Sequence, residues 1–115
     1  DVVEVKEEKN VKVYKKESKK IRALIVAEKS KATLALKKAV EKLEAEISKL
    51  EEALDHEQNE LTIATNKGDN NKTIELLRNI NKYEKDIEVK FSALEISQTK
   101  LDDMNKEFEK RMNEV

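Results

Sequence analysis

The sequence predicts an all-α fold, a two-helix antiparallel coiled-coil hairpin with an irregular N-terminal linker. Gly68 is the only glycine among the 115 residues, and the chain has no proline. On both sides of Gly68 the apolar residues recur every three or four positions, which places them on one face of a helix. A glycine followed by Asp69 and Asn70 is typical of one helix ending and another starting. These observations together predict a helical hairpin that folds at Gly68.

The composition agrees with a protein whose only core is a narrow seam. Charged residues make up 43 % of the chain and aromatic residues 3 %, which is too polar for a compact globular core but suits long paired helices. Disorder is the competing interpretation of such a composition, and the sustained apolar register argues against it for most of the chain. The length allows one domain.

The compartment is predicted from what the sequence lacks. There is no cysteine, hence no disulfide framework and no thiolate zinc site. No apolar run approaches the ~20 residues that span a bilayer, and no signal peptide is evident. We therefore expect a cytoplasmic protein with no membrane partner. A start at Asp1 rather than methionine leads us to expect a fragment of a larger chain, and processing would give the same start.

Residues 1–17 are predicted to be a basic linker, partly extended or disordered. The alternation of valine and lysine before Tyr14 is compatible with a short strand or with an extended tether, and we favour the tether. The helical pattern begins near Ser18, an acceptable N-cap. Lys19 and Lys20 would oppose the helix dipole in the first turn, so this boundary is weakly specified.

Residues 18–115 are predicted to form the hairpin, with its turn at about 66–71. In the first helix the seam positions alternate in steps of four and three, like the a and d positions of a coiled coil. They are Leu36, Val40, Leu43, Ile47, Leu50, Leu54, Glu57, Leu61 and Ala64. Nearer to the N-terminus the same side carries Ile21, Leu24, Ile25 and Ala32. The spacing between Ile25 and Leu36 departs from strict heptads and predicts a local stutter.

The second helix repeats this pattern over twelve positions, nine of them apolar. They are Leu77, Ile80, Glu84, Ile87, Phe91, Leu94, Gln98, Leu101, Asn105, Phe108, Met112 and Val115. If the chain folds near Gly68, the numbers of facing residues sum to about 137 or 138, so that Leu50 meets Ile87 and Ile25 meets Met112. A closed hairpin satisfies the seam within one chain, and we favour a monomer. An arm-swapped dimer with a straightened turn is the alternative.

Charge is distributed unevenly along the chain. Residues 6–38 hold twelve Lys or Arg and four Glu, a net charge of +8, and the remaining residues hold twelve basic and twenty-one acidic side chains, a net charge of −9. A basic cluster of this kind is a candidate surface for phosphate backbones, and a lysine-rich linker kept soluble by its charge is the plain alternative. The candidate nucleic-acid-binding residues are Lys12, Lys15, Lys16, Lys19, Lys20, Arg22, Lys37 and Lys38.

The sequence shows no chemistry of an enzyme. One glycine cannot build a phosphate-binding loop or a nucleophile elbow. His56 is the only histidine, and no second histidine or cysteine exists to complete a metal site around it. The paired acids are more simply a solvated helix face. We predict no catalytic residue, no metal site and no cofactor in this chain.

Three segments resemble the C-terminal coiled-coil extension of bacterial ABC-F ATPases of the Uup-like group. They are K-x-x-K-K at Lys16 to Lys20, L-K-K-x-V-x-K-L-E-x-E-I at Leu36 to Ile47, and F-x-x-L-E at Phe91 to Glu95. The resemblance covers about residues 15–112. Ala35 stands where many members of that family have proline in the first helix.

The resemblance implies a non-catalytic C-terminal arm of a cytoplasmic ATPase that acts on the ribosome or on nucleic acid. It implies that ATP and magnesium bind to ATP-binding cassettes of the same parent chain, and that the arm contacts DNA or ribosomal RNA. The alternative function is a structural or protein-interaction coiled coil, a spacer or dimerisation element, in which the charges only keep the surface solvated.

Overall fold

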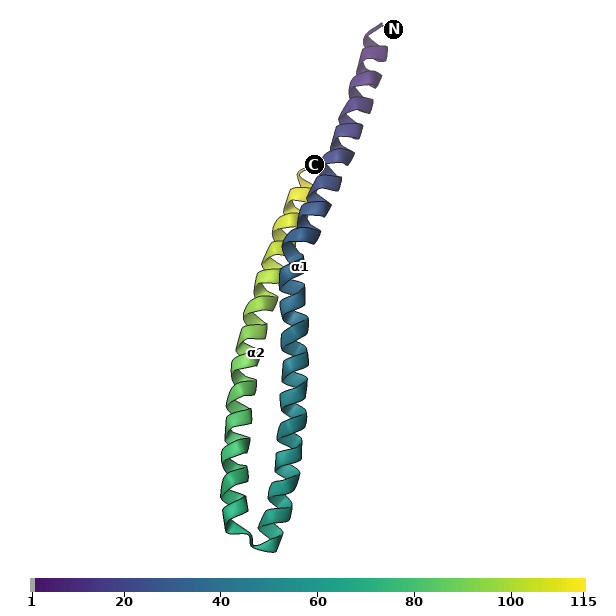
Figure 1. Cartoon of the computed structure of the whole chain (residues 1–115). Coiled ribbons are helices and arrows are strands. Elements are labelled where there is room, and N and C mark those ends of the chain that lie inside the picture. The colour runs from purple at the N-terminus through teal and green to yellow at the C-terminus, as the bar shows by residue number, and fades with distance from the viewer. Residues whose placement is uncertain (1) are drawn as a thin grey trace. The chain divides into compact units, whose positions relative to one another are not determined.

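A computed structural model of the chain contains two helices, α1 (Val2–Lys67) and α2 (Asn70–Asn113), joined by a tight turn (Figure 1). The structure describes the backbone of residues 2–115 and the side chains of residues 15–115. Residues 2–115 contain no strand. The predicted all-α helical hairpin is confirmed. Neither of the two described helices has a stretch apolar and long enough to cross a membrane.

The chain divides into two compact units. The turn unit, residues 37–99, holds the turn and the parts of α1 and α2 that adjoin it. The terminal unit, residues 1–36 and 100–115, pairs the N-terminal part of α1 with the C-terminal part of α2. In Figure 1 the yellow end of α2 lies beside α1 in the terminal unit.

Gly68 ends α1 in a Schellman motif. The Gly68 amide donates to the Thr65 carbonyl at 3.1 Å, and the Asp69 amide donates to the Ala64 carbonyl at 3.0 Å. These two bonds satisfy carbonyls that the end of the helix would otherwise leave free. Gly68 has a φ of 70°, a left-handed conformation that residues with a Cβ adopt only at a cost.

Asp69 starts α2 directly after the motif that ends α1. Its carboxylate oxygen Oδ1 accepts a hydrogen bond from the Lys72 amide at 3.1 Å, and its carbonyl accepts one from the Thr73 amide at 3.0 Å. This is the arrangement of a helix N-cap. The chain therefore reverses over Gly68 and Asp69, inside the predicted turn region of 66–71.

The structure differs from the prediction at the N-terminal end of the chain. α1 begins at Val2 rather than near Ser18, so residues 2–17 continue the helix where an extended or disordered linker was predicted. The physical reason is that this segment contains no glycine or proline, and its many Glu and Lys residues favour a helix. The valine–lysine alternation is too short to outweigh them.

The α1 side of the seam follows the prediction from Leu36, the last α1 residue of the terminal unit, through the turn unit to Ala64. None of the nine predicted residues from Leu36 to Ala64 is exposed, and Ile47 and Ala64 are buried. The pairing also agrees with the predicted register. Glu46 contacts Lys90 in the turn unit, and Glu28 contacts Arg111 in the terminal unit. These pairs of residue numbers sum to 136 and 139, close to the predicted 137 or 138.

The predicted seam of α2 is correct at eight of its twelve positions. The protected residues are Ile80, Ile87, Leu94, Leu101, Asn105, Phe108, Met112 and Val115. The prediction is wrong for four residues that are exposed: Leu77, Glu84, Phe91 and Gln98. Their places are taken by the residues one position earlier, Leu76, Tyr83, Lys90 and Ser97, which are buried or half-buried.

The physical reason for this difference is that the central seam positions of α2 have a stripe of flanking residues on each side. One stripe contains Leu77 and Phe91, the other contains Leu76 and Lys90, and either could complete the seam. A shift of one residue rotates a side chain by about 100° around the helix. Leu77 and Phe91 make their stripe the more apolar one, but the other stripe contains Leu76, which is 3 % exposed, whereas Leu77 is 50 % exposed. Apolar content alone therefore selects the wrong stripe.

In the terminal unit the predicted stutter is visible in the burial of α1. Ile25, Lys29, Thr33 and Leu36 are buried or half-buried, in steps of four, four and three, which departs from strict heptad spacing. Thr33 is fully buried, and its hydroxyl donates to the Lys29 carbonyl at 2.7 Å. The prediction that Ile21, Leu24 and Ala32 lie on the protected side is wrong, because all three are exposed.

Candidate functional site

Five of the eight predicted nucleic-acid-binding residues lie close together on α1 in the terminal unit. They are Lys15, Lys16, Lys19, Lys20 and Arg22, and all five are exposed. Glu17 is the only acidic residue among residues 15–22. Among the side chains of residues 15–115, none of these five cations forms an ion pair. The segment therefore presents a net charge of +4 over about two turns of helix.

Helical spacing separates these cations into two groups. Lys15, Lys19 and Arg22 line an open groove of about 300 Å³ together with Ser18 and Val115. Residues at spacings of three and four lie on one face of a helix, which explains why these four α1 residues share the groove. Lys16 and Lys20 do not line it.

Two side chains of the groove are directed at the same atom. Ser18 Oγ donates a hydrogen bond to the main-chain oxygen of Val115, the last residue of the sequence, and Arg22 Nη2 donates to that same oxygen, each at 3.4 Å. A hydroxyl, a guanidinium and two neighbouring ammonium groups are an arrangement suited to an oxygen that carries negative charge. The sequence indicated the cations but neither Ser18 nor the contribution of Val115.

The other three predicted residues lie elsewhere. Lys37 and Lys38 are exposed and belong to the turn unit. Lys12 lies on α1, but its side chain is outside the described residues. The structure therefore brings together Lys15, Lys19 and Arg22 out of the predicted set.

A second contact in the terminal unit joins α1 to α2 and was not predicted. Arg111 Nη2 donates to Glu28 Oε2 at 2.8 Å, and the guanidinium carbon lies 5.2 Å from the centre of the Phe108 ring. The aromatic ring and the carboxylate together hold the arginine against α1. The carboxylate of Glu28 therefore already forms an ion pair with Arg111 within the terminal unit.

Beside this contact, a groove of about 350 Å³ in the terminal unit contains a buried polar atom. Its apolar lining includes Ile25, Phe108 and Met112, and its polar lining includes Lys29 and Asn105. The oxygen Oδ1 of Asn105 is buried and has no hydrogen-bond partner among the described residues. A buried amide oxygen without a donor costs stability, which fits a polar residue placed in the seam.

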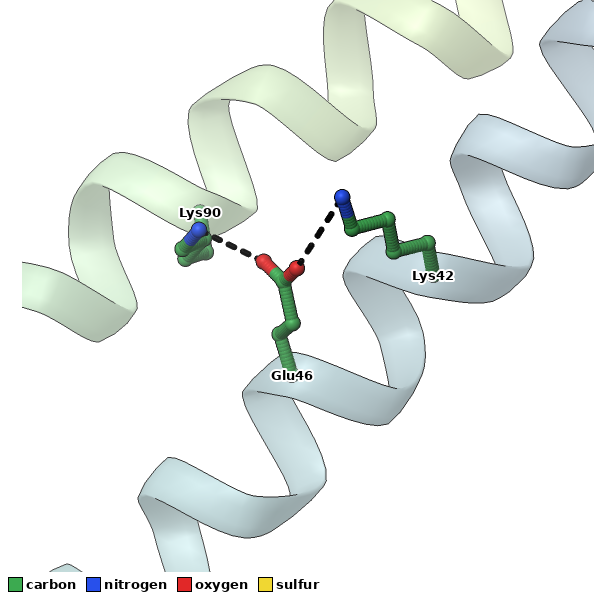
Figure 2. Close-up of polar contacts among 3 residues, drawn as sticks. All are labelled: Lys42, Glu46 and Lys90. Carbon is green, nitrogen blue, oxygen red and sulfur yellow. Dashed lines mark hydrogen bonds and ion pairs between the residues drawn. The ribbon is translucent and has the colours of Figure 1, made fainter.

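The turn unit contains a charged cluster across the two helices (Figure 2). Glu46 Oε2 on α1 accepts a hydrogen bond from Lys90 Nζ on α2 at 2.5 Å. The other carboxylate oxygen, Glu46 Oε1, lies 3.9 Å from Lys42 Nζ. The hydrogen bond from Lys90 holds the pKa of Glu46 below its ordinary value, partial burial opposes this, and the charges of Lys90, Lys42 and Lys49 lower it further. This cluster ties the helices together and resembles no catalytic arrangement.

His56 is exposed on α1, and over residues 15–115 no three His, Asp or Glu side chains gather as metal ligands. No protein-family model matches this chain, and comparison with curated proteins and with solved structures found no match. The groove at Lys15, Lys19 and Arg22 is therefore the candidate site, on its geometry and charge alone.

Proposed function

We propose that this chain is a non-catalytic helical arm that binds nucleic acid, DNA or ribosomal RNA, through the basic segment from Lys15 to Arg22. One observation carries the proposal: five exposed cations, none of them in an ion pair among the described side chains, lie within eight consecutive residues of α1. Cations that are not neutralised within the protein are available to a polyanion.

The physical basis of the binding is the release of counterions. Each phosphate that a lysine or arginine neutralises frees condensed cations from the nucleic acid, so affinity falls steeply as salt rises. A contact through five side chains predicts a strong salt dependence and little sequence preference, because phosphate contacts carry no direct sequence information.

The resemblance to C-terminal extensions of ABC-F ATPases extends this proposal to a parent protein. In that setting the arm would belong to a cytoplasmic ATPase whose cassettes bind ATP and magnesium, and it would contact the ribosome or a nucleic acid. The segments that support this are those at Lys16 to Lys20, Leu36 to Ile47 and Phe91 to Glu95.

A second function, a protein-interaction coiled coil, is favoured by a different observation. Four large apolar side chains of α1 in the terminal unit are about half or more exposed: Ile21, Leu24, Val26 and Leu34. Leu24 is 64 % exposed and lies two residues beyond Arg22. Large apolar side chains that face solvent are available for a contact with another protein.

The test is fluorescence anisotropy of labelled duplex DNA and structured RNA against the protein, in a salt series from about 50 to 200 mM. The test variant replaces Lys15, Lys16, Lys19 and Lys20 with Gln. The control variant replaces four exposed lysines of the turn unit with Gln, namely Lys49, Lys72, Lys82 and Lys85. Both variants lower the net charge by four.

We expect the wild type and the control variant to bind with a steep salt dependence, and the test variant to lose most of its affinity. An equal loss in both variants would mean that total charge, and not the segment from Lys15 to Arg22, drives binding. No binding by the wild type at the lowest salt would contradict the proposal and favour the protein-interaction coiled coil.

A further inference from the structure

We propose that the exposed flank of α2 that carries Ile74, Leu77 and Phe91 is a docking surface for a basic amphipathic helix of another protein. The surface lies in the turn unit, so it does not depend on nucleic-acid binding through the segment from Lys15 to Arg22. It includes residues that the sequence favours for the seam but that the structure leaves in contact with solvent.

Three large apolar side chains share this flank of α2. Ile74 and Leu77 are each 50 % exposed, and Phe91 is 48 % exposed. Spacings of three residues and of two heptads place all three on one side of the helix. Because burial of such side chains is favourable, a partner that covers them gains free energy that the isolated hairpin does not.

The same side of the hairpin includes a face of α1. When two antiparallel helices pair along a seam, the residues that directly follow seam positions lie on one side of the pair, and those that directly precede them lie on the other. An open groove of about 180 Å³ near the turn shows the second side, because Glu60 and Ile63 of α1 line it together with Lys72 of α2. Each of these three directly precedes a buried or half-buried position, whereas Ile74, Leu77 and Phe91 each directly follow one.

The charge on the side of Leu77 and Phe91 has one sign. Within residues 41–65 and 74–98, no lysine or arginine directly follows a buried or half-buried position. Seven exposed carboxylates do, and none of them forms an ion pair among the side chains of residues 15–115. They are Glu41, Glu44, Glu51 and Asp55 on α1 and Glu84, Glu88 and Glu95 on α2. We call these carboxylates, together with the three apolar side chains, the acidic face.

The chemistry of the acidic face identifies its partner. A segment that covers Leu77 and Phe91 must be apolar on one side, and lysine or arginine beside that side would meet the carboxylates. A helix with apolar residues at spacings of three and four fits along a stripe of the same spacing. A nucleic acid would be repelled by this face, and so would the same face of a second copy of the chain.

The opposite side of the turn unit shows why exposure alone does not select a partner. Val89 and Ile96 lie there and are 68 % and 58 % exposed, more than any apolar residue of the acidic face. The charges beside them have both signs and include Lys42, Lys49 and Asp86. A mixed surface of this kind favours no partner by charge, and it provides a matched control.

The test measures binding of a labelled peptide by fluorescence anisotropy at about 150 mM salt. The probe is a peptide of three heptads with leucine at positions a and d and lysine at positions e and g, and the control probe has the same composition in scrambled order. One variant combines Leu77→Ser with Phe91→Ser on the acidic face. Its control combines Val89→Ser with Ile96→Ser on the opposite side, and urea unfolding followed by circular dichroism checks that both remain folded.

A second pair of variants tests the contribution of charge. The first set replaces three carboxylates of the acidic face, namely Glu84→Gln, Glu88→Gln and Glu95→Gln. The control set replaces three exposed acids elsewhere in the turn unit, namely Glu52→Gln, Glu75→Gln and Asp86→Asn. Both sets raise the net charge by three.

We expect the wild type to bind the amphipathic peptide and not the scrambled one. Leu77→Ser with Phe91→Ser should weaken binding at least about tenfold, because two apolar contacts are lost, and Val89→Ser with Ile96→Ser less than about twofold. The charge variant on the acidic face should lose affinity and part of its salt dependence, whereas the control set should keep both.

Three results would overturn the proposal. They are no binding of the amphipathic peptide by the wild type, equal binding of the two peptides, and equal losses in the two serine variants. Sedimentation of the protein without peptide tests a second copy as the occupant. An increase in mass with concentration that Leu77→Ser with Phe91→Ser abolishes would assign the acidic face to self-association and would also overturn docking of another protein.

Discussion

At the scale of single residues, Gly68 and Asp69 do most to define this fold. Gly68 closes α1 with a left-handed φ of 70°, and Asp69 caps α2 with its carboxylate. Two residues therefore supply hydrogen-bond partners at the end of α1 and at the start of α2, and this is why the chain can reverse without a longer loop.

Substitution of Gly68 tests this role. A Cβ at this position would meet no atom within 4 Å, so the cost of Gly68→Ala comes from backbone strain rather than from a clash. We expect the free energy of unfolding, measured with urea, to fall by about 1 kcal/mol. Gly68→Asn should lose less, because asparagine tolerates the left-handed region better. Unchanged stability in Gly68→Ala would contradict the importance of the left-handed conformation.

Glu46 makes stability depend on pH. Its pKa is lowered in the folded protein, chiefly by the hydrogen bond from Lys90. The ionised carboxylate therefore stabilises the fold at pH values above the ordinary pKa of 4.5. This contribution is lost as the pH falls through the lowered pKa of the folded protein. We expect the difference in unfolding free energy between the wild type and Glu46→Gln to be constant above about pH 6 and to shrink below the ordinary pKa.

The measurement is a series of urea unfolding curves from neutral to acidic pH on the wild type, Glu46→Gln and Lys90→Gln. Lys90→Gln removes the main cause of the lowered pKa and should weaken the acid dependence in the same direction. A difference between the wild type and Glu46→Gln that stays constant down to acidic pH would show that the contact with Lys90 is not formed in solution.

At the scale of elements, the seam of α2 shows how far a heptad pattern specifies packing. The central positions, such as Ile80 and Leu94, are buried. The flanking positions at Leu77 and Phe91 are about half exposed, although both are large and apolar. The pattern of α2 by itself locates the middle of the seam but not which flank turns toward α1.

Two chemically identical substitutions test this arrangement. Leu94 is 9 % exposed and Leu77 is 50 % exposed, both in the turn unit. Leu94→Ala should lower the free energy of unfolding by about 2–3 kcal/mol, because it leaves a cavity in the seam. Leu77→Ala should lower it by less than about 1 kcal/mol. An equal loss of unfolding free energy in the two variants would contradict the exposed position of Leu77 and would indicate that Leu77 packs in the seam.

At the scale of the whole molecule, an overall charge near zero conceals a marked asymmetry. The net charge is −1, but residues 6–38 carry +8. Local charge, and not the total, is what a nearby polyanion encounters within the screening length of ~8 Å at physiological salt. The proposed binding through the segment from Lys15 to Arg22 is therefore compatible with a chain that is slightly acidic overall.

Oligomeric state is the prediction that belongs to this scale. Because the turn satisfies both helix ends within one chain, we expect a monomer of 13.3 kDa in sedimentation equilibrium at all concentrations tested. A species of twice that mass, increasing with concentration, would indicate arm-swapped dimers in which the turn at Gly68 has straightened.

Much of this structure could be predicted from the sequence, for local reasons. A lone glycine followed by aspartate specifies a turn wherever it lies between two helical patterns. The α1 seam from Leu36 to Ala64 was predicted without error, because its heptads are strict. The helix at residues 2–17 was missed because a short alternation of valine and lysine outweighed the absence of any helix breaker.

The candidate site was predicted only in part. The sequence indicates that Lys15, Lys16, Lys19, Lys20 and Arg22 are close along the chain, since charge can be counted in one dimension. It does not indicate that Ser18 joins Lys15, Lys19 and Arg22 at one groove, because that depends on Val115, ninety-seven residues further along the chain from Ser18.

By itself, the sequence determined the helices, the turn and the basic segment, since helix propensity, a left-handed glycine and charge are properties of neighbouring residues. The tertiary structure alone decided which stripe of α2 faces α1, and which donors meet at Val115. Both depend on how two helices are rotated about their axes when they pair. The contacts of both helices set that rotation jointly, so neither helix's own pattern contains it.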